Sequence, residues 1–201
     1  MISTRLQTRL VPLWVILIVA SGSLATRGQE ARPNPNIEMQ KQKMQVLDGL
    51  DGLWRGTMWT RTPEGARQEL TRTERVGSML DGSIKVVEGR GYNSQGQLVY
   101  NGFGVIAWDL RTGKYTLRWH ARGRVQTHEL ELIEDGYRWS MPFGPGVLVH
   151  TTRVRDGKWQ EVGERTPAGG DPVRFLEIDL ERIADTHWPS ADPVPPRDPR
   201  P

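Results

Sequence analysis

Two-residue turn signals recur along most of this 201-residue chain and limit the folds open to it. From Leu53 onward, runs of strand length alternate with turn residues, among them Asp81-Gly82, Asp135-Gly136 and Asp156-Gly157. This spacing predicts about ten strands in an antiparallel meander. Because an open sheet of that size would leave two long edges unpaired, closure on itself is the stable solution. We therefore predict an all-β fold, a single antiparallel up-and-down β-barrel.

A two-residue turn also decides which side chains of a hairpin share a face. The turn fixes the strand register, and the register fixes which residues point inward. At Asp135-Gly136 this rule places Leu132 opposite Trp139, and the four central hairpins agree on one inner wall. The residues of this wall that we expect to face a ligand are Trp108, Tyr115, Trp119, Gln126, His128, Trp139, His150, Trp159 and Glu161.

The polar residues of this wall are expected to form a hydrogen-bonded pair, not a metal site. His150 and Glu161 fall at diagonal positions on neighbouring strands, within reach of one another. His128 and His150 lie two strands apart, about 10 Å by strand spacing, which is too far for both to bind one ion without strong curvature. We therefore predict no metal ligand in this chain.

Charged residues on the second and third strands leave two interpretations open. The turn at Asp81-Gly82 pairs Arg75 with Glu88 and puts both on one face with Thr73 and Arg90. This face is either a buried charged cluster near one mouth of the barrel or a stripe exposed to solvent. We favour the buried cluster.

The first 36 residues are typical of an export signal and a linker. A basic start, an apolar run over 13–20 and small residues before Ala25 predict a signal peptide over 1–25, followed by a flexible linker over 26–36. The alternative is an uncleaved N-terminal anchor, although the run is shorter than the ~20 residues that a spanning helix needs. After cleavage no stable membrane span is expected. We predict an exported protein, periplasmic or secreted.

The remaining chain divides into a barrel domain and a tail. We expect the barrel over residues 37–183, with a short helix at 37–47 that covers one end and has Asn36 as its N-cap. Residues 184–201 are rich in proline and are predicted to form an unpacked C-terminal tail.

The composition excludes several classes of function. The chain has no cysteine, so disulfides and thiolate metal sites are ruled out. The formal net charge is +3, but Arg5 and Arg9 belong to the predicted signal peptide, and 25 basic and 24 acidic residues remain without them. This balance gives no reason to expect a nucleic-acid partner.

Several motifs carry a resemblance to known barrels. They are Gly52-Leu53-Trp54, Val86–Gly91, Gly104 to Asp109 and Asp156–Trp159, followed by Arg182 at the inner phase of the last strand. Together they resemble the calycin group, which comprises lipocalins and fatty-acid-binding proteins. Over about residues 47–183 the pattern is similar to a bacterial lipocalin-like family of unknown function.

The resemblance implies a fold and a closure contact. In lipocalins an arginine from the end of the barrel overlies the tryptophan of the Gly-x-Trp motif, and Trp54 and Arg182 match these two positions. Such a cation–π contact stabilises by about 1 kcal/mol. The chain lacks the disulfides of secreted animal lipocalins.

The function expected from the inner wall is binding of a small hydrophobic or amphipathic molecule without chemical change and without a cofactor. A barrel of this size holds at most one small ligand. One alternative is a barrel filled by its own side chains that acts as a non-catalytic accessory or protein-interaction module, with the partner unknown. Less favoured alternatives are an enzyme that uses His150 and Glu161 as acid and base, or a haem or metal binder.

Overall fold

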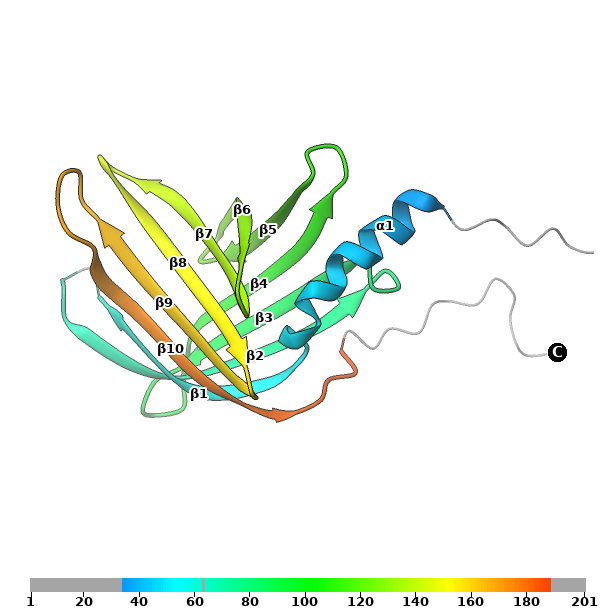
Figure 1. Cartoon of the computed structure of the whole chain (residues 1–201). Coiled ribbons are helices and arrows are strands. Elements are labelled where there is room, and N and C mark those ends of the chain that lie inside the picture. Colours follow the sequence, from blue (N-terminus) through cyan, green and yellow to red (C-terminus); the bar gives the residue numbers. More distant parts are fainter. Residues whose placement is uncertain (1–33, 63, 189–201) are drawn as a thin grey trace, which may run out of the picture. The chain divides into compact units, whose positions relative to one another are not determined.

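The chain folds into a closed antiparallel barrel of ten strands preceded by one helix (Figure 1). The computed structural model describes residues 34–62 and 64–188. Each strand pairs with its neighbours in the sequence, and β1 pairs with β10 to close the ring, which confirms the predicted fold. The strands are β1 (Gly52–Arg61), β2 (Arg67–Met79), β3 (Ile84–Tyr92), β4 (Leu98–Asp109), β5 (Lys114–Ala121), β6 (Arg124–Ile133), β7 (Gly136–Phe143), β8 (Gly146–Arg155), β9 (Lys158–Thr166) and β10 (Val173–Ala184).

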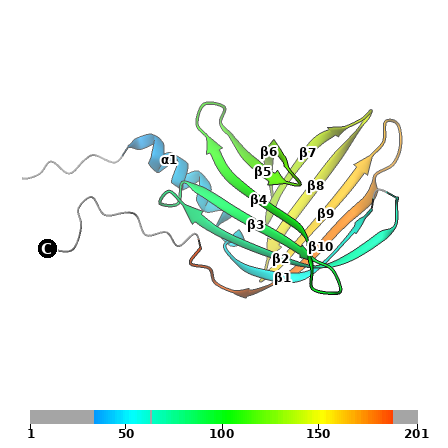
Figure 2. The same cartoon turned by 180° about the vertical axis from the view of Figure 1, so that it is seen from behind.

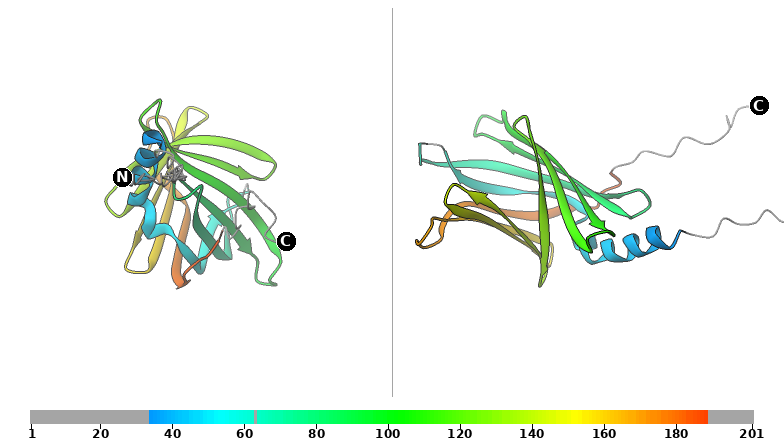
Figure 3. Two further views of the ribbon diagram at one scale, coloured as in Figure 1. Left: turned by 90° about the vertical axis from the view of Figure 1, so that its right-hand side faces the viewer. Right: turned by 90° about the horizontal axis from the view of Figure 1, so that it is seen from above.

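A helical segment covers one end of the barrel, as expected (Figure 3, left). It consists of α1 (Pro35–Met44) and the 3-10 helix η1 (Gln45–Leu50). The N-cap of α1 is Asn34, whose side chain accepts a hydrogen bond from the backbone N–H of Asn36, so the helix begins earlier than predicted. Met44, Leu47 and Leu50 are buried in the core of the barrel. Their burial holds the segment on the barrel and closes this end.

Two hydrogen bonds tie α1 to the barrel wall. The Tyr115 hydroxyl donates to the carbonyl of Lys43 at 2.7 Å, and Gln40 Nε2 donates to the carbonyl of Trp108 at 2.9 Å. The Lys43 ammonium also lies 5.0 Å from the centre of the Trp108 ring. Trp108 and Tyr115 therefore support the closed end.

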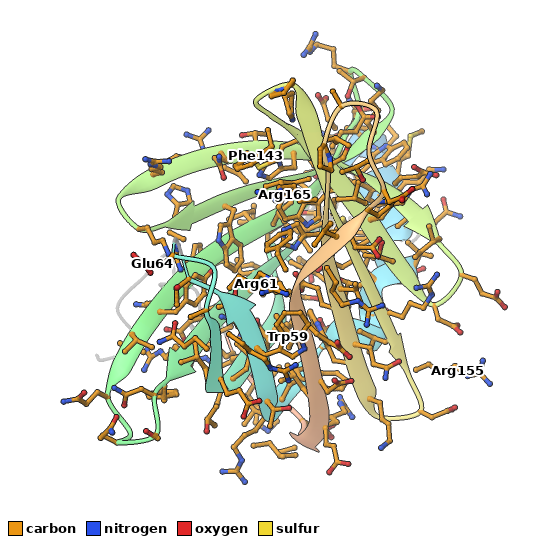
Figure 4. All side chains as sticks on the ribbon, turned by 90° about the vertical axis from the view of Figure 1, so that its left-hand side faces the viewer. Trp59, Arg61, Glu64, Phe143, Arg155 and Arg165 are labelled. Atoms are coloured by element: carbon orange, nitrogen blue, oxygen red, sulfur yellow. The ribbon has the colours of Figure 1, made fainter. Side chains whose placement is uncertain are left out.

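The end opposite α1, which we call the mouth, is formed by the turns that follow the odd-numbered strands. Figure 4 looks toward it and labels Trp59, Arg61, Glu64, Phe143 and Arg165. The Arg165 guanidinium lies 5.8 Å from the centre of the exposed Phe143 ring. No helix covers these turns in the described part of the chain.

The first and last strands meet at the two residues expected to close the barrel. Trp54 on β1 stands opposite Arg182 on β10, and the guanidinium carbon lies 6.0 Å from the centre of the indole. Trp54 is buried and donates its ring N–H to the carbonyl of Leu50 at 2.9 Å. Arg182 donates from Nη2 to the carbonyl of Asp51 at 2.7 Å. Both side chains therefore connect the barrel seam to the residues just before β1.

One predicted register is wrong by two residues. The turn between β6 and β7 is made by Glu134 and Asp135, so Leu132 pairs with Tyr137 and not with Trp139. Asp135 takes the left-handed backbone conformation that such turns need, with φ of 58°. Because side chains alternate with a period of two, this shift leaves the predicted facing of β6 and β7 unchanged.

Part of the C-terminal segment packs on the outside of the barrel, which corrects the expectation of an unpacked tail for the residues up to 188. The Trp188 ring meets the Phe103 ring edge to face at 6.2 Å, and the Arg75 guanidinium lies 4.5 Å from its centre. Among residues 34–62 and 64–188, no helix has the length and apolar character needed to cross a membrane.

Candidate functional site

Stacked rings line one inner wall between the middle of the barrel and the mouth. Trp139 on β7 lies between His128 on β6 and His150 on β8, with 4.2 Å between ring centres on each side. The planes of Trp139 and His150 differ by only 5°. On the far side, His150 meets the ring of Phe175 edge to face at 5.5 Å. We call these four residues the ring ladder.

The ring ladder crosses β9 at a glycine. Gly163 stands directly opposite His150, and a Cβ at this position would lie 2.9 Å from the Phe175 ring. The missing side chain therefore makes room for Phe175, which reaches over from β10. Phe175 lies in an irregularity of β10 between Arg174 and Leu176, which is why strand alternation did not identify it.

The ring ladder bridges β6 and β7 where these two strands are not paired through their backbones. β6 and β7 pair only at Glu131–Ile133 and Gly136–Arg138, next to the closed end. Towards the mouth, His128 and Trp139 are joined by ring stacking instead of by a strand register. The contact between their rings thus closes the wall at this point.

The geometry of the ring ladder limits how a ligand can bind to this wall. Both faces of Trp139 are covered by histidines, so a flat ligand has no free face on which to stack. The same stacking separates the two histidines and prevents them from sharing an ion. In the described ranges, no group of three or more His, Asp or Glu side chains is arranged to hold a metal.

His150 and Glu161 form the predicted pair. His150 Nδ1 lies 2.9 Å from Glu161 Oε1, and both side chains are mostly buried. Burial alone would raise the pKa of the Glu161 carboxyl, but the hydrogen bond with His150 and the charge of Arg72 lower it. Burial lowers the pKa of His128, and the charge of His150 lowers it further. This wall therefore favours an ionised Glu161 and a neutral His128.

A buried ion pair on β2 extends the polar interior and was missed by the sequence prediction. Arg72 donates from Nε to Glu74 Oε1 at 2.8 Å, and both residues are about 95% buried, with 5% of each exposed. Gly89 faces the pair from β3, where a Cβ would collide with both side chains. Arg72 also lies 4.7 Å from the centre of the Tyr100 ring, whose hydroxyl accepts the Trp119 ring N–H at 3.2 Å.

The face predicted to be buried on these strands is the outer one. Arg75 and Arg90 are half-exposed and bind Glu88 on the outside of the barrel, whereas Arg72 and Glu74 alternate with them and point inward. The predicted pairing of Arg75 with Glu88 is correct, but the predicted facing is wrong. The buried charged residues of β2 are thus Arg72 and Glu74, which alternate with the residues predicted to be buried.

Three buried polar atoms in this interior lack a hydrogen-bond partner among the described residues. One is Thr152 Oγ1, and the other two are Glu74 Oε2 and the ring N–H of Trp159, which is 2% exposed. Trp54 connects the two, because it stands beside Glu74 in the sheet and packs its ring against Trp159 at 5.7 Å. Burial raises the pKa of the Glu74 carboxyl to about 7, although the charge of Arg72 works against this. An unpaired acceptor and an unpaired donor are therefore buried in one layer of the barrel.

The predicted ligand-facing residues fall into three groups. Trp108, Tyr115 and Trp159 belong to the closed half of the barrel, where Tyr115 and Trp159 are buried. Gln126 is exposed close to the β5–β6 turn. The structure brings the rest to the middle and mouth-side interior, namely Trp119, His128, Trp139, His150 and Glu161.

Three surface depressions of about 290 to 330 Å³ lie elsewhere on the barrel. One lies along β1 and β2 beside the turn after β3 and includes Trp59 and Arg67. Another lies on β1 to β3 around Arg75 and Glu88, and the third surrounds Asp135 and Arg153. None of the three includes a residue of the ring ladder.

Comparison with known proteins supports the fold. No protein-family model matches the sequence, and no curated protein matches it. Among solved structures, Rv2717c from M. tuberculosis is similar with a TM-score of 0.53 and 13% identity, over 70% of this chain and 96% of that one. The S-type phycobiliprotein lyase CPES from Guillardia theta has a TM-score of 0.49 and 10% identity, over 75% of this chain and 98% of that one.

At these identities the likeness concerns the fold alone. The chain is a closed ten-strand antiparallel barrel, and its likeness to Rv2717c supports this fold.

Proposed function

We propose that this protein binds a small amphipathic molecule inside the barrel and does not change it chemically. The molecule enters through the mouth. The observation that carries this proposal is the pair of unpartnered buried atoms, Glu74 Oε2 and Trp159 Nε1. A buried polar group without a partner destabilises a fold by about 1–3 kcal/mol. A ligand with both a donor and an acceptor would satisfy the two groups.

The mouth-side wall provides the apolar part of such a site. Leu148, Met141 and Leu176 occupy inner positions on β8, β7 and β10 and remain half-exposed. With the edges of the ring ladder, they form an apolar surface above the polar layer. Apolar walls with a few oriented polar groups are the usual lining of small-molecule sites. The polar end of the ligand would therefore lie deep, and its apolar part near the mouth.

Membership of the bacterial lipocalin-like family and export are parts of this proposal. The residues that predict the signal peptide, 1–25, lie outside the described part of the chain. N-terminal sequencing of the protein from its native host tests export directly. A mature protein that begins after Ala25 is the expected result, and an intact N-terminus would contradict it.

The binding proposal is tested on the mature protein by native mass spectrometry before and after solvent extraction. We expect a co-purifying small molecule, or saturable binding of decanol or decylamine measured by quenching of tryptophan fluorescence. Glu74→Gln should weaken binding at least tenfold, whereas Glu131→Gln on the outer face should leave it unchanged. A protein that carries no molecule and binds neither probe would contradict the proposal.

A filled barrel that acts as an accessory module is the second candidate, and one observation favours it. Trp54 and Trp159 are buried, and Trp139 is covered on both faces, so much of the interior is occupied by the protein itself. In this case water would satisfy Glu74 and Trp159. Ordered water at both atoms in a crystal structure, together with no binding of either probe, would support this candidate.

A further inference from the structure

A basic depression lies on the outer face of the barrel, separate from the interior site. It has a volume of about 290 Å³ and is lined by residues of β1, β2 and β3, the neighbouring strands labelled in Figure 2. Its charged and hydroxyl-bearing outer-face residues are Arg55, Thr73, Arg75, Glu88, Arg90 and Tyr92. The depression also borders Leu53, Ile183 and the strand positions of Trp54 and Glu74, two residues that are buried in the barrel.

Two of its arginines converge on one carboxylate. Arg75 Nη2 lies 2.7 Å from Glu88 Oε2, and Arg90 Nη2 lies 2.7 Å from Glu88 Oε1. A guanidinium has five N–H donors, so each arginine keeps donors beyond those that Glu88 uses. Trp188 packs against Arg75 at 4.5 Å and limits the positions that its guanidinium can adopt. Glu88 thus orients the two arginines without using up their capacity to bind.

The third arginine is not neutralised by the carboxylate that faces it. Arg55 stands opposite Glu181 on β10 and opposite Thr73 on β2. Glu181 instead lies 3.4 Å from Lys158, and no ion pair of Arg55 is found within the ranges that the structure describes. Arg55 therefore presents an exposed guanidinium to the depression.

The charges of the depression do not balance. Three guanidinium groups surround one carboxylate, which leaves two positive charges around a concave surface that also carries the Thr73 and Tyr92 hydroxyls. Arginine clusters bind phosphate strongly because the planar guanidinium donates two parallel hydrogen bonds to it. A dianion that accepts several hydrogen bonds matches both the charge and the donors.

We propose that this depression binds a phosphate group, with Arg55, Arg75 and Arg90 as its ligands. The site goes beyond the proposed interior function and does not depend on it. The phosphate group comes from one of two sources, a soluble phosphate compound or the headgroup of a lipid.

Titration with inorganic phosphate at low ionic strength tests the site. The signals of the arginine side chains in ¹H–¹⁵N NMR spectra report the binding. We expect saturable shifts at Arg55, Arg75 and Arg90, with chloride at equal ionic strength giving none. Arg55→Gln should weaken binding at least tenfold. Arg118→Gln, an exposed arginine on β5, should not change it. Equal weakening by both variants, or shifts spread over all arginines, would overturn the proposal.

Two further ligands distinguish between the two sources of the phosphate group, a soluble compound and a lipid headgroup. Glycerol 3-phosphate represents a soluble phosphomonoester, and vesicles of phosphatidylcholine with or without phosphatidic acid represent a lipid surface. Tighter binding of glycerol 3-phosphate than of inorganic phosphate supports the soluble source. Binding to vesicles that requires phosphatidic acid and is lost in Arg55→Gln supports the headgroup. No binding to phosphate, glycerol 3-phosphate or acidic vesicles overturns the site and leaves the interior binding proposal unaffected.

Discussion

The Trp139 indole lies almost parallel to the His150 imidazole, with planes that differ by 5° and centres 4.2 Å apart. On its other face, Trp139 stacks on His128 at the same distance. The indole therefore fixes the spacing between two titratable rings. Because the rings are held so close, the protonation of one histidine should affect the other.

We predict that His150→Gln raises the pKa of His128. Burial lowers the pKa of His128 from its usual value of 6.5, and the charge of His150 lowers it further. The variant removes only the second cause, so the pKa should rise but stay below 6.5. NMR titration of the His128 ring measures this directly. An unchanged pKa would show that the two rings do not interact through Trp139.

We predict that Glu74 makes stability fall as the pH rises from about 4.5 to about 7. Burial raises the pKa of its carboxyl from 4.5 to about 7 in the folded protein, so in this range the folded state holds a proton that the unfolded state releases. The free energy of unfolding should lose on the order of 3 kcal/mol from this group across the window. Arg72, Glu161 and Glu88 are the charged groups that act on it.

Urea unfolding of the wild type and Glu74→Gln at several pH values isolates this effect. The stability difference between the two proteins should shift in favour of the variant as the pH rises. Glu161 has the opposite effect on stability and acts at lower pH. Because the pKa of its carboxyl is lowered in the folded protein, the stability that it contributes is lost as the pH falls below 4.5. A difference that is independent of pH would contradict the protonation assigned to Glu74.

On the strands of the candidate site, the side of the sheet to which each side chain points could be predicted from the sequence, because it depends only on alternation along the strand. The two-residue error at the turn of Glu134 and Asp135 did not move Trp139 to the other face, since an even shift preserves facing. Alternation was also enough to pair His150 with Glu161 across neighbouring strands. The wall of the candidate site was therefore accessible without a structure.

The buried ion pair was not accessible in the same way. Polarity normally marks the outer face of a strand, and on β2 both faces carry charges, so the pattern could not decide between Arg72 and Arg75. The signal that could have found the pair is Gly89, since a residue without a side chain on the neighbouring strand leaves room for large ones. Phe175 escaped prediction because an irregularity in β10 breaks the alternation.

We predict that Lys85→Met loosens the helical segment at the closed end. Lys85 is fully buried, and its Nζ donates to Asp51 Oδ1 at 2.8 Å and to Asp48 Oδ1 at 2.9 Å. Methionine keeps most of the aliphatic volume but loses the hydrogen bonds to both aspartates and the one to Ser78 Oγ at 3.0 Å. The side chains of Asp48 and Asp51 are 62% and 31% exposed, respectively, so both carboxylates can return to water. The expected loss of stability is therefore about 1–3 kcal/mol.

Hydrogen exchange of η1 provides the measurement for Lys85→Met. The amides of Gln45–Leu50 should exchange faster in the variant, while those of β7 and β8 should not change. Lys114→Met, which removes an exposed ion pair with Glu129, serves as the matched control. Equal protection of η1 in both variants would mean that the buried ammonium does not hold the segment.

We predict that Trp54 stabilises the barrel seam far more than Arg182 does, although the two residues face each other across it. Trp54 is buried, packs its ring against Trp159 at 5.7 Å and donates to the carbonyl of Leu50. Trp54→Ala should therefore destabilise the protein by about 3–5 kcal/mol. The Arg182 side chain is 40% exposed, and Arg182→Ala should cost about 1 kcal/mol or less.

A double-mutant cycle with Trp54→Phe and Arg182→Ala separates the contact from the burial of the indole. Phenylalanine keeps an aromatic face but loses the hydrogen bond to Leu50 and part of the cation–π attraction. With the guanidinium 6.0 Å from the ring centre, the coupling energy should be about 0.5 kcal/mol and of stabilising sign. A coupling of zero would assign the stability of the seam to strand pairing and indole burial alone.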